Sequence, residues 1–169
     1  MLPNFRLLQA IQSGCLADFN EAVKDGASPS AKDLNGDHAL VVAYKAGNPN
    51  LARRLIELGA SPDGIIDGRG DHLIHRAART GNYGLMSVLL EAGVDANLRG
   101  AKQRTALHHS ARLGHEYAVR LLLRHKANPS LEDAVSNTPL QLAARDHRNS
   151  RNVTAKVLAV SLNRSFDFA

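Results

Sequence analysis

Apolar residues recur at helical spacing in short segments, and polar, glycine-containing stretches separate these segments. In residues 72–96, "HLIHRAARTGNYGLMSVLLEAGVDA", one segment ends at Gly81 and a second begins directly and ends at Gly93. A glycine after the last apolar residue favours the left-handed conformation that ends a helix. The pattern therefore predicts two short helices joined by a tight turn.

The same pattern recurs along the whole chain with a period of 33 or 34 residues. Residues 105–129, "TALHHSARLGHEYAVRLLLRHKANP", match residues 72–96 in type at position after position. The first turn is marked by Gly14, Gly47, Gly81, Gly114 and, in the last unit, His147, and the second by Gly26, Gly59, Gly93 and Lys126. The period predicts five units. Their approximate bounds are 1–32, 33–66, 67–99, 100–132 and 133–169.

Helices of about eight to ten residues are marginal alone in water. Stacked side by side, such pairs share a continuous apolar seam, each unit contacting its neighbours. We therefore expect one all-α solenoid domain over residues 1–169, built from stacked helix-turn-helix units with short projecting turns or hairpins. The first and last units are expected to be caps. The punctuating glycines exclude long uninterrupted helices.

Composition supports a soluble intracellular protein. The chain has 44% hydrophobic residues but only 4% aromatic ones, so Ala, Leu and Val must fill the core. Cys15 is the only cysteine, which excludes an intrachain disulfide and fits a reducing compartment. Residues 1–14 do not resemble a secretory signal, and no apolar run is long enough to span a membrane. We expect a cytoplasmic location; delivery into another cell stays open.

The units resemble ankyrin repeats, whose pattern runs roughly Gly-x-Thr-Pro-Leu-His-x-Ala-Ala-x-x-Gly, followed by an amphipathic helix ending Leu-Leu-x-x-Gly-Ala. In the fifth and fourth units the matching residues are Thr138, Pro139, Leu140, Ala143, Ala144, and Thr105, Leu107, His108, Ala111, Gly114, Leu122, Leu123. In the third unit they are Gly70, His75, Ala77, Ala78, Gly81, Leu89, Leu90 and Gly93. In the second they are Gly36, Leu40, Ala43, Gly47, Leu55, Gly59 and Ala60. In the first they are Ala10, Gly14, Gly26 and Ala27. The resemblance implies binding of another protein through a concave surface.

No catalytic, cofactor or metal site is expected. His72 and His75 are three residues apart and His108 and His109 are adjacent, but no cysteine or carboxylate joins them at a spacing typical of zinc. The resemblance instead implies that His75 and His108 form internal hydrogen bonds between successive turns. Cys15 near a helix start has no obvious base. We therefore predict a protein that is not an enzyme.

One column of equivalent positions is basic in every repeat after the first. It contains Lys45, Arg79, Arg112 and Arg145. The resemblance places this column at the end of the inner helix, beside the groove. Neighbouring helices lie roughly 8–10 Å apart, so we expect a row of positive charges, which Arg69, Lys102 and Arg104 on the turns extend. A cation near a helix C-terminus also stabilises the helix by roughly 0.3–1 kcal/mol, so the column has a purely structural explanation as well.

We expect these seven cations to bind a partner protein, in particular an acidic segment, with Leu34 and Val135 at turn tips as further candidates. Acidic residues among the turns form a mixed rim. Nucleic-acid binding is the alternative, since the net charge is +5 and an arginine row can follow phosphates; the acidic rim and the scarcity of exposed aromatic residues disfavour it. A small bacterial effector or immunity-type accessory protein is a third hypothesis. A monomer is favoured, and the partner's identity is open.

Overall fold

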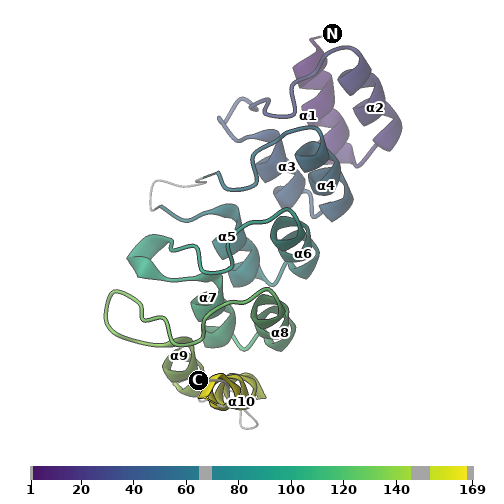
Figure 1. The fold of residues 1–169 in the computed structure, drawn as a ribbon. Coiled ribbons are helices and arrows are strands. Elements are labelled where there is room, and N and C mark those ends of the chain that lie inside the picture. Colours follow the sequence, from purple (N-terminus) through teal and green to yellow (C-terminus); the bar gives the residue numbers. More distant parts are fainter. Residues whose placement is uncertain (1, 65–69, 146–152, 167–169) are drawn as a thin grey trace. The chain divides into compact units, whose positions relative to one another are not determined.

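The computed structural model describes residues 2–64, 70–145 and 153–166, with the side chains of the last segment described to residue 163. It divides into two compact parts, Met1–Ile66 and Asp67–Ala169. We call these parts the first and second units, and the 33-residue units of the sequence are called repeats. Each unit is built from pairs of antiparallel helices, and in the described residues before 146 a tight turn joins the two helices of each pair (Figure 1). The fold is therefore the all-α arrangement of repeated helix pairs that the period predicts. One domain over residues 1–169 stays a prediction.

The first unit holds two helix pairs. Its helices are α1 (Pro3–Ser13), α2 (Leu16–Lys24), α3 (Ala39–Lys45) and α4 (Pro49–Glu57). α1 packs against both α2 and α3, and α3 against α4. Phe19 and Leu55 are fully buried among these helices. Gln9 and Gln12 of α1 are exposed, as expected for a cap.

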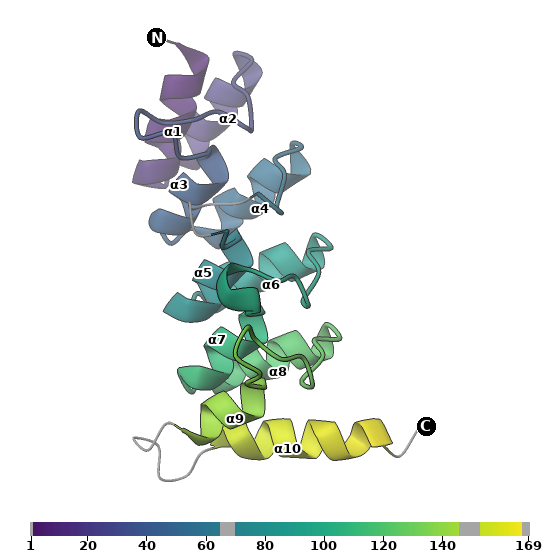
Figure 2. The same ribbon diagram turned by 90° about the vertical axis from the view of Figure 1, so that its left-hand side faces the viewer.

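The second unit holds three helix pairs. Its helices are α5 (Leu73–Thr80), α6 (Tyr83–Glu91), α7 (Ala106–Arg112), α8 (Glu116–Arg124), α9 (Pro139–Ala144) and α10 (Val153–Phe166), with a single 3₁₀ turn, η1 (Ala101–Gln103), before α7. The inner helices α5, α7 and α9 pack in series, and α6, α8 and α10 form a second layer (Figure 1). α10, 14 residues long, packs against α8 and α9 (Figure 2).

Helix ends follow the local sequence. Gly81 ends α5 in the left-handed conformation, with φ of 68°. Asn48 and Asn82 begin α4 and α6, and the side-chain oxygen of each accepts the backbone N–H of the third residue on, at 3.1 Å in both cases. These caps keep each helix short, so that its apolar face is buried only by neighbouring helices.

The turns between repeats lie on one side of the inner helices of the second unit (Figures 1 and 2). Two buried histidines fix them. His75 Nδ1 accepts the backbone N–H of His72 at 3.1 Å, and its Nε2 lies 2.9 Å from the carbonyl of Leu98 in the next turn. His108 makes equivalent contacts with Thr105 (3.2 Å) and with the carbonyl of Asn137 (3.0 Å). The predicted turn-to-turn role of these histidines is thus confirmed.

Candidate interaction surface

The predicted cations occupy equivalent places on successive inner helices. Lys45, Arg79 and Arg112 lie in the last turns of α3, α5 and α7, and Arg145 directly follows α9. A cation at this place stabilises a helix end by about 0.3–1 kcal/mol, whatever else it does. Lys45 belongs to the first unit and the others to the second, so a continuous column of four stays a prediction. Arg69 lies outside the described residues.

Two of these cations form ion pairs within their own repeat. Lys45 pairs with Asp37, and Arg79 NH1 lies 3.1 Å from Oδ2 of Asp71. In both pairs the cation follows the acid by eight residues. Side chains on a helix point toward its N-terminus, so a long basic side chain at the end of the inner helix extends back to the turn. The Asp71 side chain is only 2% exposed, and a buried carboxylate needs such a partner.

The next two repeats lack this acid. Arg104 and Asn137 occupy the positions equivalent to Asp37 and Asp71. Arg112 and Arg145 are both exposed, and within the described part of the chain neither forms an ion pair or a hydrogen bond through its side chain. The equivalent position thus changes from a paired cation to an unpaired one along the chain.

Arg104 is held in place by the following repeat. Its Nε lies 3.0 Å from Oδ2 of Asp133, whose side chain is 1% exposed. Burial by itself raises the pKa of Asp133. Hydrogen bonds from the backbone N–H groups of Asn137 and Val135, and from Arg104, together outweigh that effect and lower the pKa to about 2. Arg104 therefore fixes one turn to the next, and its charge is largely neutralised.

Arg99 is a cation of the same turn that the sequence interpretation missed. It is exposed, and NH1 donates to the carbonyl oxygens of Gln103 (3.3 Å) and Glu132 (2.9 Å). Carbonyls orient the guanidinium without cancelling its charge. We call Arg99, Lys102 and Arg104 the basic turn. The run "RGAKQR" at 99–104 was the available signal.

The backbone of the basic turn is tightly constrained. Lys102 and Gln103 both have positive φ, 58° and 56°, a conformation that costs about 1–2 kcal/mol for a residue other than glycine. Asp71 Oδ1 accepts the backbone N–H of Ala101 at 3.0 Å, and Lys102 O accepts that of Ala134 at 2.9 Å. A Cβ on Gly100 would lie 2.7 Å from Asp71 Oδ1, so glycine is required there. The exposed Lys102 side chain therefore projects from a fixed base.

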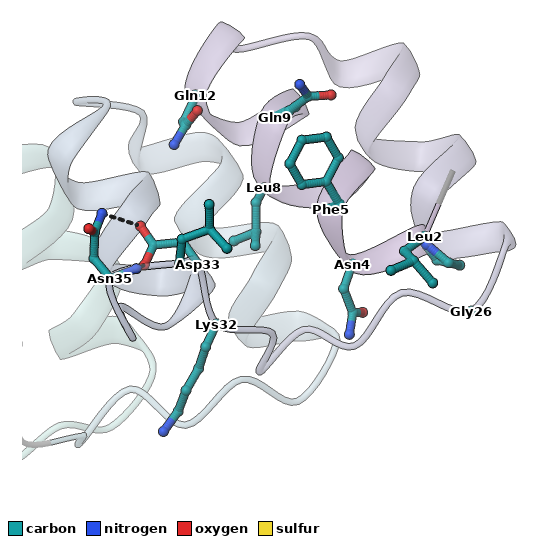
Figure 3. A pocket seen from close by; sticks show the side chains of 12 residues that line it. Leu2, Asn4, Phe5, Leu8, Gln9, Gln12, Gly26, Lys32, Asp33 and Asn35 are labelled. Carbon is teal, nitrogen blue, oxygen red and sulfur yellow. Dashed lines mark hydrogen bonds between the residues drawn. The ribbon is translucent and has the colours of Figure 1, made fainter.

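A separate pocket of about 580 Å³ lies within the first unit. Figure 3 shows Leu8 of α1 beside the turn residue Asp33, and Phe5 and Lys32 also line the pocket. Leu34, which also lines the pocket, is 99% exposed. Val135, at the equivalent turn tip of the second unit, is 71% exposed. Both predicted tip residues thus present apolar side chains to solvent.

The structure corrects one argument from composition. Phe5, Tyr83 and Tyr117 are substantially exposed, whereas we expected almost no exposed aromatic residues. The two tyrosine rings are 5.2 Å apart between centroids and lie at the starts of the outer helices α6 and α8. Chain-wide aromatic content does not reveal that the starts of two neighbouring outer helices share a solvent-facing edge. The absence of aromatics therefore no longer argues against nucleic acid.

The described residues form no metal-binding cluster. Over the described ranges 2–64, 70–145 and 153–166, no group of three or more His, Cys, Asp or Glu residues is placed to hold a metal ion. Cys15 is half-buried at the start of α2. Among the helices that the structure describes, none is both long and apolar enough to cross a membrane.

Comparison with known proteins agrees with this architecture. A family model described as "Ankyrin repeats (3 copies)" matches residues 7–100 and again residues 74–164. A putative ankyrin repeat-containing protein of Treponema pallidum is 34% identical over 126 residues, which are 75% of this chain and 42% of that protein. Human ankyrin repeat domain-containing protein 63 is 32% identical over 116 residues, covering 64% of this chain and 30% of the relative.

Human inversin is 43% identical over 63 residues, which are 37% of this chain and 6% of inversin. The chain thus spans less than half the length of each of these relatives. These relatives share the ankyrin repeat with this chain.

Proposed function

The chain belongs to the ankyrin repeat family, and we propose that it binds a partner protein through the face formed by its inner helices and turns, which the sequence predicts to be concave. Ankyrin repeats generally mediate protein–protein interactions and are typically non-catalytic. The observation that supports this face is a set of exposed side chains that form no ion pair or side-chain hydrogen bond with other described residues. In the second unit Arg112 and Arg145 are charged members of the set and Val135 is an apolar one; in the first unit Leu34 is an apolar one.

A rigid surface favours binding, because little conformational freedom remains to be lost on docking. Hydrogen bonds from His75 and His108 to the following turns supply that rigidity in the second unit. Positive charge on the face favours an acidic partner segment and raises the encounter rate. The same proposal includes a cytoplasmic location. It also includes partner binding by the remaining predicted cations, which are Lys45, Arg69, Arg79, Lys102 and Arg104.

Site-specific photo-crosslinking tests the proposed face. A photoreactive phenylalanine analogue placed at Val135, on a turn tip, is expected to capture a partner protein in extract from the native source. The same analogue at Arg124, exposed on the outer helix α8, is the matched control and is expected to capture none. Capture from Arg124 alone, or from neither position, would contradict the proposal.

Nucleic-acid binding is the second candidate, and two observations favour it: Arg112 and Arg145, which form no ion pair with other described residues, and the exposed Tyr83–Tyr117 pair. Binding to phosphates weakens steeply as salt increases. Titration with random-sequence DNA and RNA at low and high salt therefore distinguishes the two functions. Absence of binding at low salt removes this candidate.

A further inference from the structure

The charge pattern of the repeats narrows the proposed function to one class of partner and one part of the chain. The second and third repeats pair the inner-helix cation with an acid eight residues earlier, as Lys45 with Asp37 and Arg79 with Asp71. The fourth and fifth repeats keep the cation, Arg112 or Arg145, and replace the acid by Arg104 or Asn137. The fourth and fifth repeats therefore contain the cation but not the acid that pairs with it in the second and third repeats.

Repulsion between cations on adjacent helices offsets part of the stabilisation that each gives its own helix end. α7 and α9 pack directly against each other, and Arg112 and Arg145 lie at equivalent places on them. At the roughly 10 Å spacing of packed helices, like charges at the protein surface repel weakly. Carboxylates from another molecule would relieve that repulsion, and each could form an ion pair with one arginine.

The basic turn precedes α7, at the opposite end of that helix from Arg112. Arg99 and Lys102 are exposed there, and within the described residues neither has a carboxylate at ion-pair distance. Backbone hydrogen bonds to Asp71 and from Ala134 hold the turn in place. Four cations of the second unit, Arg99, Lys102, Arg112 and Arg145, thus form no ion pair with any other described residue, and an anion could bind them without displacing one of those residues.

We propose that the second unit binds an acidic segment of its partner protein at Arg99, Lys102, Arg112 and Arg145, while Lys45 and Arg79 serve the fold through their own aspartates. This inference rests on the proposed protein-binding function. It predicts that the binding charge is concentrated in the fourth and fifth repeats instead of being spread over all repeats.

A protein segment fits this surface better than a nucleic acid. Single-strand binding combines a cationic path with aromatic side chains on which successive bases stack. Here the exposed tyrosines begin the outer helices α6 and α8, whereas the basic turn precedes the inner helix α7.

Fluorescence anisotropy with a fluorescein-labelled, glutamate-rich peptide tests the inference. A peptide of equal length with serine in place of glutamate, and a single-stranded DNA of comparable length, are the comparison ligands. The variant Arg112→Glu/Arg145→Glu is expected to weaken binding of the glutamate peptide by about tenfold or more, since each reversal replaces attraction by repulsion. Arg112→Gln/Arg145→Gln should give a smaller loss in the same direction.

The matched control is Arg124→Glu/Lys156→Glu, which makes the same change in net charge at exposed positions of α8 and α10. It is expected to leave peptide affinity within about twofold of the wild type, as rim charges chiefly alter encounter rates. Circular dichroism and urea unfolding of all variants establish that they are folded. An equal loss in both double variants, or tighter and equally sensitive binding of the DNA, would overturn the inference.

The two proposals fail in different ways. If Val135 crosslinks a partner while Arg112→Glu/Arg145→Glu binds the glutamate peptide like the wild type, the acidic segment is refuted and protein binding stands. If neither crosslinking nor peptide binding occurs, the proposed function fails as well.

Discussion

Arg79 and Arg112 occupy the same position in successive repeats, yet in the described part of the chain only Arg79 has a carboxylate within ion-pair distance. The sequence predicted both as exposed binding cations. It did not show which of them is neutralised, because the partner of Arg79 is a side chain eight residues away whose approach depends on the turn geometry. Equivalent residues in a repeat protein therefore differ in function when their neighbours differ.

The pH dependence of the free energy of unfolding tests the burial of His109. It is 6% exposed, and neither ring nitrogen has a hydrogen-bond partner among the described residues. Burial, with a smaller contribution from His75, lowers its pKa from 6.5 to about 4. Between these values the unfolded chain binds a proton that the folded chain does not, so the free energy of unfolding falls as pH decreases from about 6.5 toward 4.

Replacing His109 by leucine, the residue at the equivalent position 142, should remove that contribution. Urea unfolding at pH 7 and near pH 4.5 is expected to show a smaller acid loss for His109→Leu, by as much as about 3 kcal/mol for a shift of this size. Identical pH profiles for the two proteins would show that His109 is not held neutral by burial.

A substitution at Lys102 tests whether the positive φ there lowers the free energy of unfolding while the side chain supports binding. Its positive φ is tolerated better by asparagine than by lysine. Lys102→Asn should therefore raise the free energy of unfolding by up to about 1 kcal/mol while weakening binding of the glutamate-rich peptide. Lys126→Asn is the control, because Lys126 also has positive φ but follows the outer helix α8. It should stabilise without affecting binding; a loss of stability in both would contradict the strain argument.

At the scale of elements, the helices were predictable because each begins and ends on local chemistry. Asn48–Pro49 begins α4 and Gly81 ends α5, as their sequence positions indicate. The basic turn was not predictable in detail. Its shape depends on Asp71 of one repeat and Ala134 of another, contacts that arise only after the repeats stack.

Leu89 tests the packing of one outer helix. It is fully buried in α6, so Leu89→Ala removes apolar contacts and leaves a cavity. The expected loss is about 2–5 kcal/mol in the free energy of unfolding, measured by urea denaturation. Val160→Ala, in the exposed part of α10, should change it by less than about 0.5 kcal/mol. Equal effects at the two sites would contradict the assigned core.

At the scale of the molecule, the period of 33 or 34 residues was sufficient to predict the repeated helix pairs, and the resemblance of residues within each repeat indicated the family. It was not sufficient to locate the binding charge. Periodicity averages over repeats, whereas the difference between Asp71 in one repeat and Arg104 in the next breaks the period. Departures from the repeat pattern are thus the informative positions for function.

The central claim is that an acidic protein segment binds the inner face of the fourth and fifth repeats. Backbone amide NMR during titration with the glutamate-rich peptide measures this directly, residue by residue. Shift changes are expected at residues 99–104, at the end of α7 and around Arg145, with little change in α8. Changes centred on the outer helices, or no changes at saturating peptide, would contradict the claim.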